Sequence, residues 1–327
     1  EVGIDVRDDD ELVEKFRHSG ARIDGIRVRF EPGHVRELLK TAPREFTQHA
    51  RNPARSVQIG GKNVVFAPSY GSPFVMDLDR GRRYGTLDDF QNFIKLAYSC
   101  PWLHHSGGTV CEPTDVPVNK RHLDMVYAHM RYSDKAFLGS VTTVERAEDS
   151  IEMSRILHGR DFVDQNCVIM GNVNVNSPLL WDGTATKVIR AYARANQASV
   201  IVPFILGGAM GPVTNAAGSF TTSKLPDGQA MQESVMSMLS AIHCGANFLL
   251  HSAGFLDGLL SMSYEKFMMD ADFCGALHSY LAGVVVDDNT LAMDAFREVT
   301  PGGHYLGSAH TMANYTTAFF DSTISDN

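Results

Sequence analysis

The sequence predicts an α/β fold: a (β/α)₈ barrel of parallel strands preceded by a small α+β domain. Two observations support this prediction. From Thr86 onward, helix-like stretches alternate with short apolar stretches, the pattern of a parallel sheet covered by helices. Residues 1–85 instead mix short helical and β-rich stretches joined by Gly and Pro turns. We therefore expect an N-terminal cap domain at residues 1–85 and the barrel at residues 86–327.

Periodicity and breaker residues place the individual elements. In the cap domain we expect helices at 11–18 and 34–42 and β-rich stretches at 25–30, 57–59 and 63–67. The barrel opens with a helix after Thr86 that carries Asp88 and Asp89 in its first turn. Its strands are expected at 103–107, 136–140, 168–173, 199–206, 217–222 and 247–252, with a weaker one at 305–308. Its later helices are expected at 119–132, 147–157, 184–195, 227–244, 264–283 and 287–298.

Seven strands are one fewer than a closed barrel needs. The deficit has a location, because only a short Gly- and Pro-bearing stretch separates strand 199–206 from strand 217–222. A parallel crossover takes about a dozen residues or more and usually contains a helix. We therefore infer that a segment on the order of two ~30-residue βα units is missing between Asn215 and Ala216.

Composition excludes several functional classes. The 29 Lys and Arg residues against 38 Asp and Glu give a net charge of −9, which favours neither nucleic acid nor an anionic membrane as a partner. The five cysteines are widely spread, odd in number and without a C-x-x-C pair, which is typical of free thiols in the cytoplasm. No apolar run approaches the ~20 residues of a membrane-spanning helix, and nothing resembles a signal peptide.

Polar residues gather where two predicted strands end. Thr222, Ser223 and Lys224 follow one strand, and His251 and Ser252 end another. Parallel α/β folds bind ligands beyond the carboxyl ends of their strands. We call this end of the strands the mouth, and we expect the site there.

Several longer motifs carry a family resemblance. They are F-A-P-S-Y-G-S-P-F-V-M-D (66–77), G-R-R-Y-G-T-L-D-D-F (81–90), G-N-V-N-V-N-S-P-L (171–179), P-F-I-L-G-G-A-M-G-P-V-T (203–214), S-K-L-P-D-G-Q-A-M-Q-E (223–233) and the stretch G-A-N-F-L-L-H through F-M-M-D (245–270). In this order, over nearly the whole chain, they resemble the trimethylamine methyltransferase family, in its branch without pyrrolysine. The family pattern has a further strand and helices between G-P-V-T and S-K-L-P-D.

The resemblance implies transfer of a methyl group from a methylated amine to the cobalt of a corrinoid. Relatives without pyrrolysine are similar to glycine betaine methyltransferases, which use quaternary amines. The chain lacks the D-x-H-x-x-G pattern of a corrinoid-binding module. The corrinoid (cobalamin) is therefore expected to arrive on a separate small corrinoid-binding protein, and the enzyme itself is expected to be a homo-oligomer.

The implied chemistry assigns roles to candidate residues. A quaternary ammonium is best held by aromatic faces, and a betaine carboxylate needs hydrogen-bond donors. Asparagines on the strand at 168–173 and its loop could orient the substrate or the corrin edge. The expected catalytic residues are His251, Lys224 and Asn174. The expected substrate-binding residues are Tyr70, Phe74, His104, Asn172, Phe204, Phe220, Phe255, His304 and Tyr305, and the expected corrinoid-proximal residues are Asn176, Gly207, Gly208 and Ser223.

Competing interpretations remain for several of these residues. His104, His105 and Cys111 would suit a zinc-dependent barrel methyltransferase, but adjacent histidines on a strand point to opposite faces, so we expect no metal. His251 could be a core histidine, Lys224 could pair with Asp227, and the asparagines could be turn-capping groups. A non-catalytic betaine-binding protein is a further alternative. The 207–211 loop lacks the spacing of a nucleotide-binding motif.

Overall fold

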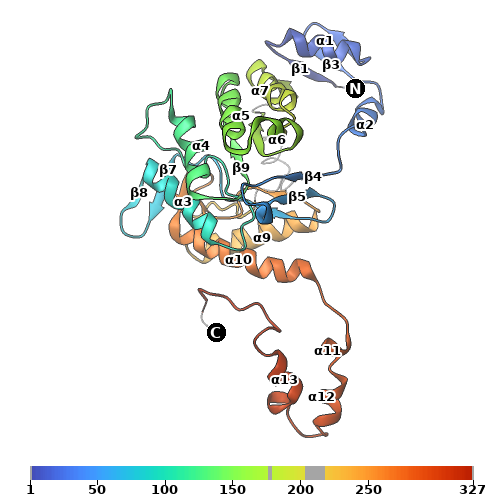
Figure 1. The fold of residues 1–327 in the computed structure, drawn as a ribbon, viewed down its shortest axis with the longest axis vertical. Helices are drawn as coiled ribbons and strands as arrows, with labels where there is room; N and C mark the ends of the chain where they lie inside the picture. The colour runs from blue at the N-terminus through green and yellow to red at the C-terminus, as the bar shows by residue number, and fades with distance from the viewer. Residues whose placement is uncertain (1, 176–178, 203–217, 326–327) are drawn as a thin grey trace. The chain divides into compact units, whose positions relative to one another are not determined.

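The computed structural model describes residues 2–175, 179–202 and 218–325 (Figure 1). The chain divides into two units, residues 1–270 and residues 271–327, with the boundary inside helix α10 (Tyr264–Ala282). The first unit holds the parallel strands and every candidate residue discussed below except His304 and Tyr305. No helix in the described ranges combines the length and apolar character of a bilayer span.

The first unit begins with a small sheet and helix. Strands β1 (Ile4–Val6), β2 (Arg22–Asp24) and β3 (Arg27–Arg29) are joined by β11 (Leu180–Trp181) in the order β11-β1-β3-β2. Helix α1 (Asp10–His18) closes a small core against them, and α2 (His34–Leu39) follows. The buried carboxylate of Asp9 caps α1 and also accepts hydrogen bonds from Thr186 and Arg190 of α7. These hydrogen bonds join the N-terminal sheet to helix α7, which packs on the central parallel strands.

Parallel strands form the centre of the first unit. Strands β9 (Phe137–Gly139), β10 (Ile169–Asn174) and β12 (Ala198–Val202) are paired in the order β12-β10-β9, and β6 (Val65–Phe66) pairs with β13 (Phe248–Leu249). The segment around His105 joins the two groups: His105 bridges to Ala136, and the backbone N–H of His104 donates to Phe66 O over 3.1 Å. On the far side of β13, Gly218 N donates to Leu250 O over 2.7 Å.

These pairings confirm the expected mixed α/β class and most of the expected strands. The strands predicted at 136–140, 168–173 and 247–252 are present, and the one predicted at 199–206 begins at Ala198 and continues into residues outside the described ranges. Residues 103–107 contribute an isolated bridge instead of a full strand, and residues 218–222 form no strand. The described residues form no closed ring of eight strands. The domain boundary at residue 85 stays a prediction, although β6, which precedes it, pairs within the parallel set.

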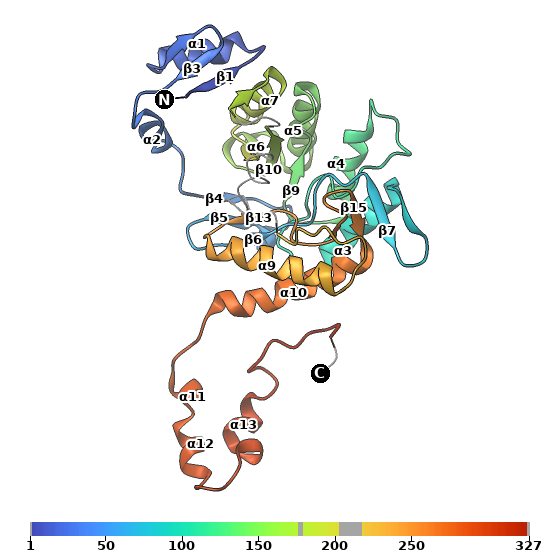
Figure 2. The same cartoon turned by 180° about the vertical axis from the view of Figure 1, so that it is seen from behind.

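The amino ends of the parallel strands are covered by a hairpin. Strands β4 (Glu45–Gln48) and β5 (Val57–Gly60) pair antiparallel and are linked through the 3₁₀ turn η1 (Pro53–Arg55). The side-chain amide of Gln48 donates to Phe137 O and Val168 O, at the start of β9 and just before β10. Figure 2 shows the hairpin beside β6 and β13. Because this end is closed, the opposite end is the one open to ligands.

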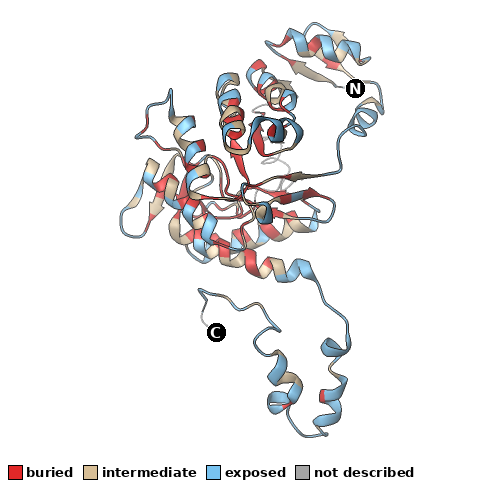
Figure 3. Cartoon of the chain, in the orientation of Figure 1, coloured by how far each residue is buried: buried red, intermediate tan, exposed pale blue. Residues whose placement is uncertain are grey.

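Helices cover the outer face of the strands. They alternate with the strands along the chain, and their inner faces are buried while their outer faces are exposed (Figure 3). The expected helices are confirmed within a few residues at either end. They are α3 (Leu87–Ser99), α4 (Arg121–Tyr132), α5 (Val144–His158), α7 (Gly183–Arg194), α9 (Gly228–His243) and α10, whereas the short α6 (Arg160–Gln165) was not expected from the sequence.

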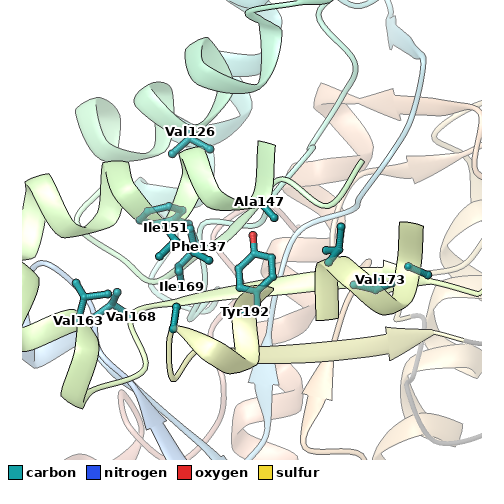
Figure 4. Close-up of a cluster of buried hydrophobic side chains, with 12 residues drawn as sticks. Val126, Phe137, Ala147, Ile151, Val163, Val168, Ile169, Val173 and Tyr192 are labelled. Atoms are coloured by element: carbon teal, nitrogen blue, oxygen red, sulfur yellow. The ribbon is translucent and has the colours of Figure 1, made fainter. Parts of the chain in front are cut away.

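Tyr192 fixes how α7 packs on β9 and β10 (Figure 4). Its ring is buried between the strands and helices, and its hydroxyl donates to Ser140 O over 2.9 Å. A Cβ atom at Gly139 or Gly171 would come within 2.4 Å and 2.8 Å of Tyr192 atoms. Two neighbouring strands therefore need glycine at this level so that the aromatic ring can lie against them.

A second sheet flanks the mouth in the order β14-β15-β7-β8. Its strands are β14 (Phe255–Leu256), β15 (Ser261–Ser263), β7 (Phe74–Asp77) and β8 (Gly81–Tyr84). Helix α3 starts beside it with a capping box between Thr86 and Asp89, and Asp89 also pairs with Arg83. Its strands β14 and β15 lie between His251 and α10 in the chain, and β15 pairs with β7, so the sheet holds that segment in place.

The second unit consists of short helices. They are α11 (Asp288–Leu291), α12 (Met293–Glu298) and α13 (Ala309–Asn314), with a 3₁₀ turn η2 (Tyr305–Gly307). The helix expected at 287–298 is interrupted at Ala292, whose φ of 51° lies in the left-handed region. The strand expected at 305–308 was wrong, because Ser308 caps α13 by accepting the N–H of Thr311 and the preceding residues turn into that helix.

Candidate functional site

Tyr70 and His251 meet at the mouth. Tyr70 follows β6 and His251 follows β13, the neighbouring parallel strand. The backbone N–H of Tyr70 donates to Nδ1 of His251 over 3.0 Å. His251 adopts φ +63°, an unusual conformation for a residue other than glycine, and such residues concentrate at functional sites. Both residues were expected at the site from the sequence.

Aromatic rings continue from His251 along one side. The ring of Phe255 lies edge-on to that of His251 at 5.1 Å between centroids, and Phe220 stacks on Phe255 at 5.5 Å. Phe255 is fully buried, while Tyr70 and Phe220 are partly exposed. The structure therefore brings together the rings of Phe220, His251 and Phe255, and bonds the backbone of Tyr70 to His251; we call these four predicted residues the aromatic cluster. Burial lowers the pKa of His251 to about 4, so its ring is neutral at pH 7 and does not repel a cation.

Two of the asparagines lie on one face of β10. Asn172 and Asn174 pair in register with Val200 and Val202 of β12. Asn172 is buried and its Oδ1 has no hydrogen-bond partner in the described part of the chain, whereas Asn174 is exposed. Asn172 shares its face of the strand with Met170, which belongs to the inner cluster that Tyr70 contacts. An unpaired buried carbonyl oxygen is costly and suggests a missing partner.

Three predicted residues point to other partners. The ring face of Phe74 is covered by the guanidinium of Arg82, 3.8 Å from its centroid. Nδ1 of His104 accepts the backbone N–H of Phe66, and the two rings stack. The side chain of Lys224 is 80% exposed and its Nζ lies 3.4 Å from a carboxylate oxygen of Asp257. The sequence suggested Asp227 as the partner of Lys224, and that interpretation was wrong because Asp227 instead caps α9.

Ser223 belongs to a loop held by Glu233 of α9. The hydroxyl of Ser223 contacts Asp227 and Leu225 O, and its N–H reaches Glu233. Burial acts to raise the pKa of Glu233, but hydrogen bonds from Thr221, Gln229 and Thr222 lower it to about 2. The carboxylate is therefore ionised at neutral pH and clamps the loop at the mouth.

The other predicted positions fall outside this cluster. His304 and Tyr305 belong to the second unit, where both are exposed. Asn176, Phe204, Gly207 and Gly208 lie outside the described residues.

A cleft opens between Tyr70, the ends of β9 and the segment around Gly108, and helix α4. It holds about 70 Å³ of free volume. Several polar and charged side chains line it that were not expected from the sequence: Glu112, Arg121, His122, His129 and Arg146. We call it the Tyr70 cleft. His122 and His129 are seven residues apart in a helix, so they share one face, and this spacing is the signal that the sequence offered.

His129 is a structural member of the cleft wall. Its Nε2–H donates to Gly108 O and its Nδ1 accepts the hydroxyl of Ser106, both at 2.8 Å. Burial lowers its pKa to about 4. The ring thereby holds the loop after residue 107 against α4 and has no valence left for a ligand.

No group of three or more His, Cys, Asp or Glu side chains in the described ranges is arranged to hold a metal ion. His105 points inward, where its Nε2–H donates to Gln48 and its Nδ1 accepts the N–H of Gly107. Cys111 is a buried free thiol whose pKa is raised by burial. The arrangement suits binding of a small organic cation, with neutral and aromatic groups at the mouth.

Comparison with known proteins assigns the family. The family model described as trimethylamine methyltransferase matches residues 1–218 and residues 215–327. The chain belongs to the trimethylamine methyltransferase family. The match in two pieces meets where the sequence predicted a missing segment.

Individual relatives agree along the chain. It is 36% identical to a glycine betaine methyltransferase of Desulfitobacterium hafniense (strain Y51) over 396 residues, covering 100% of this chain and 82% of the relative. It is 22% identical to a proline betaine:corrinoid methyltransferase of Eubacterium limosum over 398 residues, covering 96% of the chain and 81% of that relative. The chain is also 13% identical in sequence to the protein in a crystal structure of the Methanosarcina barkeri monomethylamine methyltransferase (MtmB). The superposition has a TM-score of 0.36 and covers 84% of this chain and 60% of the MtmB chain.

Proposed function

We propose that this protein transfers a methyl group from a quaternary amine, glycine betaine or a close analogue, to the cobalt of a corrinoid carried by a separate small protein. The observation that carries the proposal is the 36% identity, over the whole chain, to a protein named glycine betaine methyltransferase. The aromatic cluster at the mouth supports it, because aromatic faces are the usual recognition device for methylated ammonium groups.

The chemistry requires little acid or base catalysis from the protein. The methyl carbon forms a new bond to cobalt(I), whose electron pair supplies that bond, while the C–N bonding pair stays on nitrogen. The amine leaves as a neutral tertiary amine, and no proton moves. The protein's tasks are to orient the substrate and to exclude water. The neutral His251 and the uncharged Asn172 and Asn174 are suited to these tasks, since a fixed cation beside the methylated ammonium would oppose binding.

The aromatic cluster should bind the substrate only moderately. The positive charge on nitrogen disappears as the methyl group leaves, so a very tight cation cage would stabilise the substrate more than the transition state. In the described cluster, Tyr70 and Phe220 are partly exposed, and Phe255, stacked on Phe220, is fully buried. Such an incomplete cage is consistent with moderate ground-state binding.

We also propose that the parallel strands belong to a (β/α)₈ barrel in the relatives of this chain. The matched pieces of the family model meet at residues 215–218, and the alignment with the glycine betaine methyltransferase is 396 residues long against 327 in this chain. Both findings support a segment between Asn215 and Ala216 in those relatives. A cytoplasmic location and a homo-oligomeric state, expected from the sequence, remain part of the proposal.

The test is an incubation of the protein with free cob(I)alamin and a panel of methylated amines, followed by absorbance. We expect methylcobalamin to form with glycine betaine and to form poorly or not at all with trimethylamine. Turnover with no quaternary amine would refute the proposed activity. Tight binding of glycine betaine without methyl transfer would instead favour a binding protein.

A further inference from the structure

One basic side chain in the Tyr70 cleft, Arg146, hydrogen-bonds only to neutral groups in the described part of the chain. Arg146, in the first turn of α5, donates through Nη1 to the hydroxyl of Thr142 over 3.0 Å and through Nη2 to Val118 O over 2.9 Å. Both acceptors are neutral, and within the described ranges no carboxylate accepts a hydrogen bond from the guanidinium of Arg146, although the charge of neighbouring Glu145 acts on it. Its positive charge therefore stays available to an anion in the cleft.

His122 lines the same cleft, and one of its ring nitrogens has no hydrogen-bond partner in the described part of the chain. The side chain is 7% exposed, and its Nε2–H donates to Asp149 over 2.8 Å. Its Nδ1 is buried and has no hydrogen-bond partner within the described part of the chain. Buried polar atoms are almost always paired, so an orphaned ring nitrogen lining a cleft indicates a ligand atom. His129, on the same face of α4, has both nitrogens engaged, so the difference between the two rings is specific to His122.

Other residues of the same lining have a different character. Tyr70 lines the cleft and its backbone links it to His251 of the aromatic cluster, and Glu112, also in the lining, pairs with Arg121. The lining thus offers aromatic and acidic groups to a cation and basic groups to an anion. Its volume of about 70 Å³ is several times what one water needs, which suits a small ligand and not a corrinoid ring.

We propose that Arg146 and His122 bind the carboxylate of a betaine whose methylated ammonium lies toward Tyr70. The proposal rests on the proposed function and adds the residues that select zwitterionic substrates. Arg146 supplies a guanidinium, which forms charge-assisted hydrogen bonds with carboxylates. An imidazolium at His122 would present Nδ1–H as a second donor, with Asp149 fixing the ring orientation. Choline and tetramethylammonium, which lack the carboxylate, gain nothing from either residue.

The experiment measures binding by titration calorimetry for two ligands, glycine betaine and tetramethylammonium, which share the methylated ammonium. The variants are Arg146→Ala and His122→Ala in the full chain, with His122→Asn as a partial mimic of the Nδ1 side of the ring. Arg155→Ala on the same helix is the matched control, because Arg155 pairs with Glu152 and Asp164 at the surface. Circular dichroism of each variant checks that the fold is retained.

We expect Arg146→Ala to raise the Kd for glycine betaine at least ~10-fold while tetramethylammonium binding changes less than ~2-fold. His122→Ala should follow in the same direction, His122→Asn should recover part of the loss, and Arg155→Ala should resemble the wild type. Equal losses for both ligands, or no loss in folded Arg146→Ala and His122→Ala, would overturn the proposal. So would failure of the wild-type protein to bind glycine betaine. Binding of this kind without methyl transfer would refute only the proposed activity.

Discussion

The histidines inside the first unit and those at the mouth differ in how fully their rings are engaged. His105 and His129 use both ring nitrogens in hydrogen bonds within the protein. His122 and His251 each use one, and no partner is seen for the other nitrogen in the described ranges. The two interior histidines therefore satisfy their own ring nitrogens, while the two at the mouth leave one ring nitrogen each that a substrate can use. Changes in the interior should cost stability, and changes at the mouth should cost function.

The largest effect is expected from the buried ion pair of Lys266 and Asp270. Both side chains are fully buried in α10; Lys266 also contacts Ser234, and Asp270 accepts the N–H of Gly254. Removing one partner leaves an unpaired buried charge, so Lys266→Met should lower the free energy of unfolding by about 3–5 kcal/mol. Denaturant titration measures this. The double variant Lys266→Met with Asp270→Leu should regain much of the loss, and equal stability of the wild type and the single variant would contradict the account.

The engaged histidines predict how stability depends on pH. Burial lowers the pKa of His129 to about 4, and burial together with nearby His129, His104 and Lys135 lowers that of His105 to about 3. In the unfolded chain each titrates near pH 6.5, so the unfolded state binds more protons below that pH. The stabilisation that these two neutral histidines contribute to the folded state is fully present above pH ~6.5 and is lost as the pH falls toward 4.

Denaturant titrations at several pH values between 4.5 and 7 test this. As the pH is lowered, the free energy of unfolding should decrease by up to about 1.4 kcal/mol per pH unit for each histidine. His129→Gln should remove about one histidine's share of that slope. An unchanged slope in that variant would show that His129 does not titrate as described.

At the mouth, the expected losses are in turnover. Tyr70→Ala and His251→Ala should each reduce turnover of glycine betaine at least ~10-fold, which corresponds to roughly 1.4 kcal/mol of transition-state stabilisation. His251→Asn should retain more activity, because Asn tolerates the positive φ of this residue and its carbonyl can accept the N–H of Tyr70. Wild-type rates in folded alanine variants would remove both residues from the site.

Lys224 should give the smallest effect. Its side chain is largely exposed and pairs at the surface with Asp257, and such pairs contribute about 1 kcal/mol or less. We expect Lys224→Ala to change turnover by no more than ~2-fold. A loss of 10-fold or more would restore the catalytic role that the sequence suggested.

Local rules predicted much of the fold. The start of a helix after Thr86, with acidic residues in its first turn, and the alternation of helices with apolar strands were readable in the sequence, and the elements follow them. The strand at 305–308 could not be recognised as wrong, because only the cap at Ser308 makes that stretch turn into α13. The role of residues 63–67 in the parallel set was also hidden, since pairing with β13 links positions more than 180 residues apart.

The candidate site was also predictable only in part, because contacts between residues far apart in the sequence decide which side chains are free. The sequence identifies strand ends, so Tyr70 and His251 could be proposed before their contact was known. It does not identify which ring faces are already occupied, and Phe74 was chosen although Arg82 covers it. His122 and Arg146 were missed because their significance lies in missing partners, which only the packing of α4 and α5 against the mouth reveals.

The most direct test of the central claim follows both products of a single turnover from glycine betaine carrying a ¹³C-labelled methyl group. Protein, labelled substrate and cob(I)alamin are mixed, and NMR and absorbance are recorded together. Dimethylglycine and methylcobalamin appearing in equal amounts is the result that the account predicts. Unchanged glycine betaine beside unmethylated cobalamin, with folded protein, would contradict it.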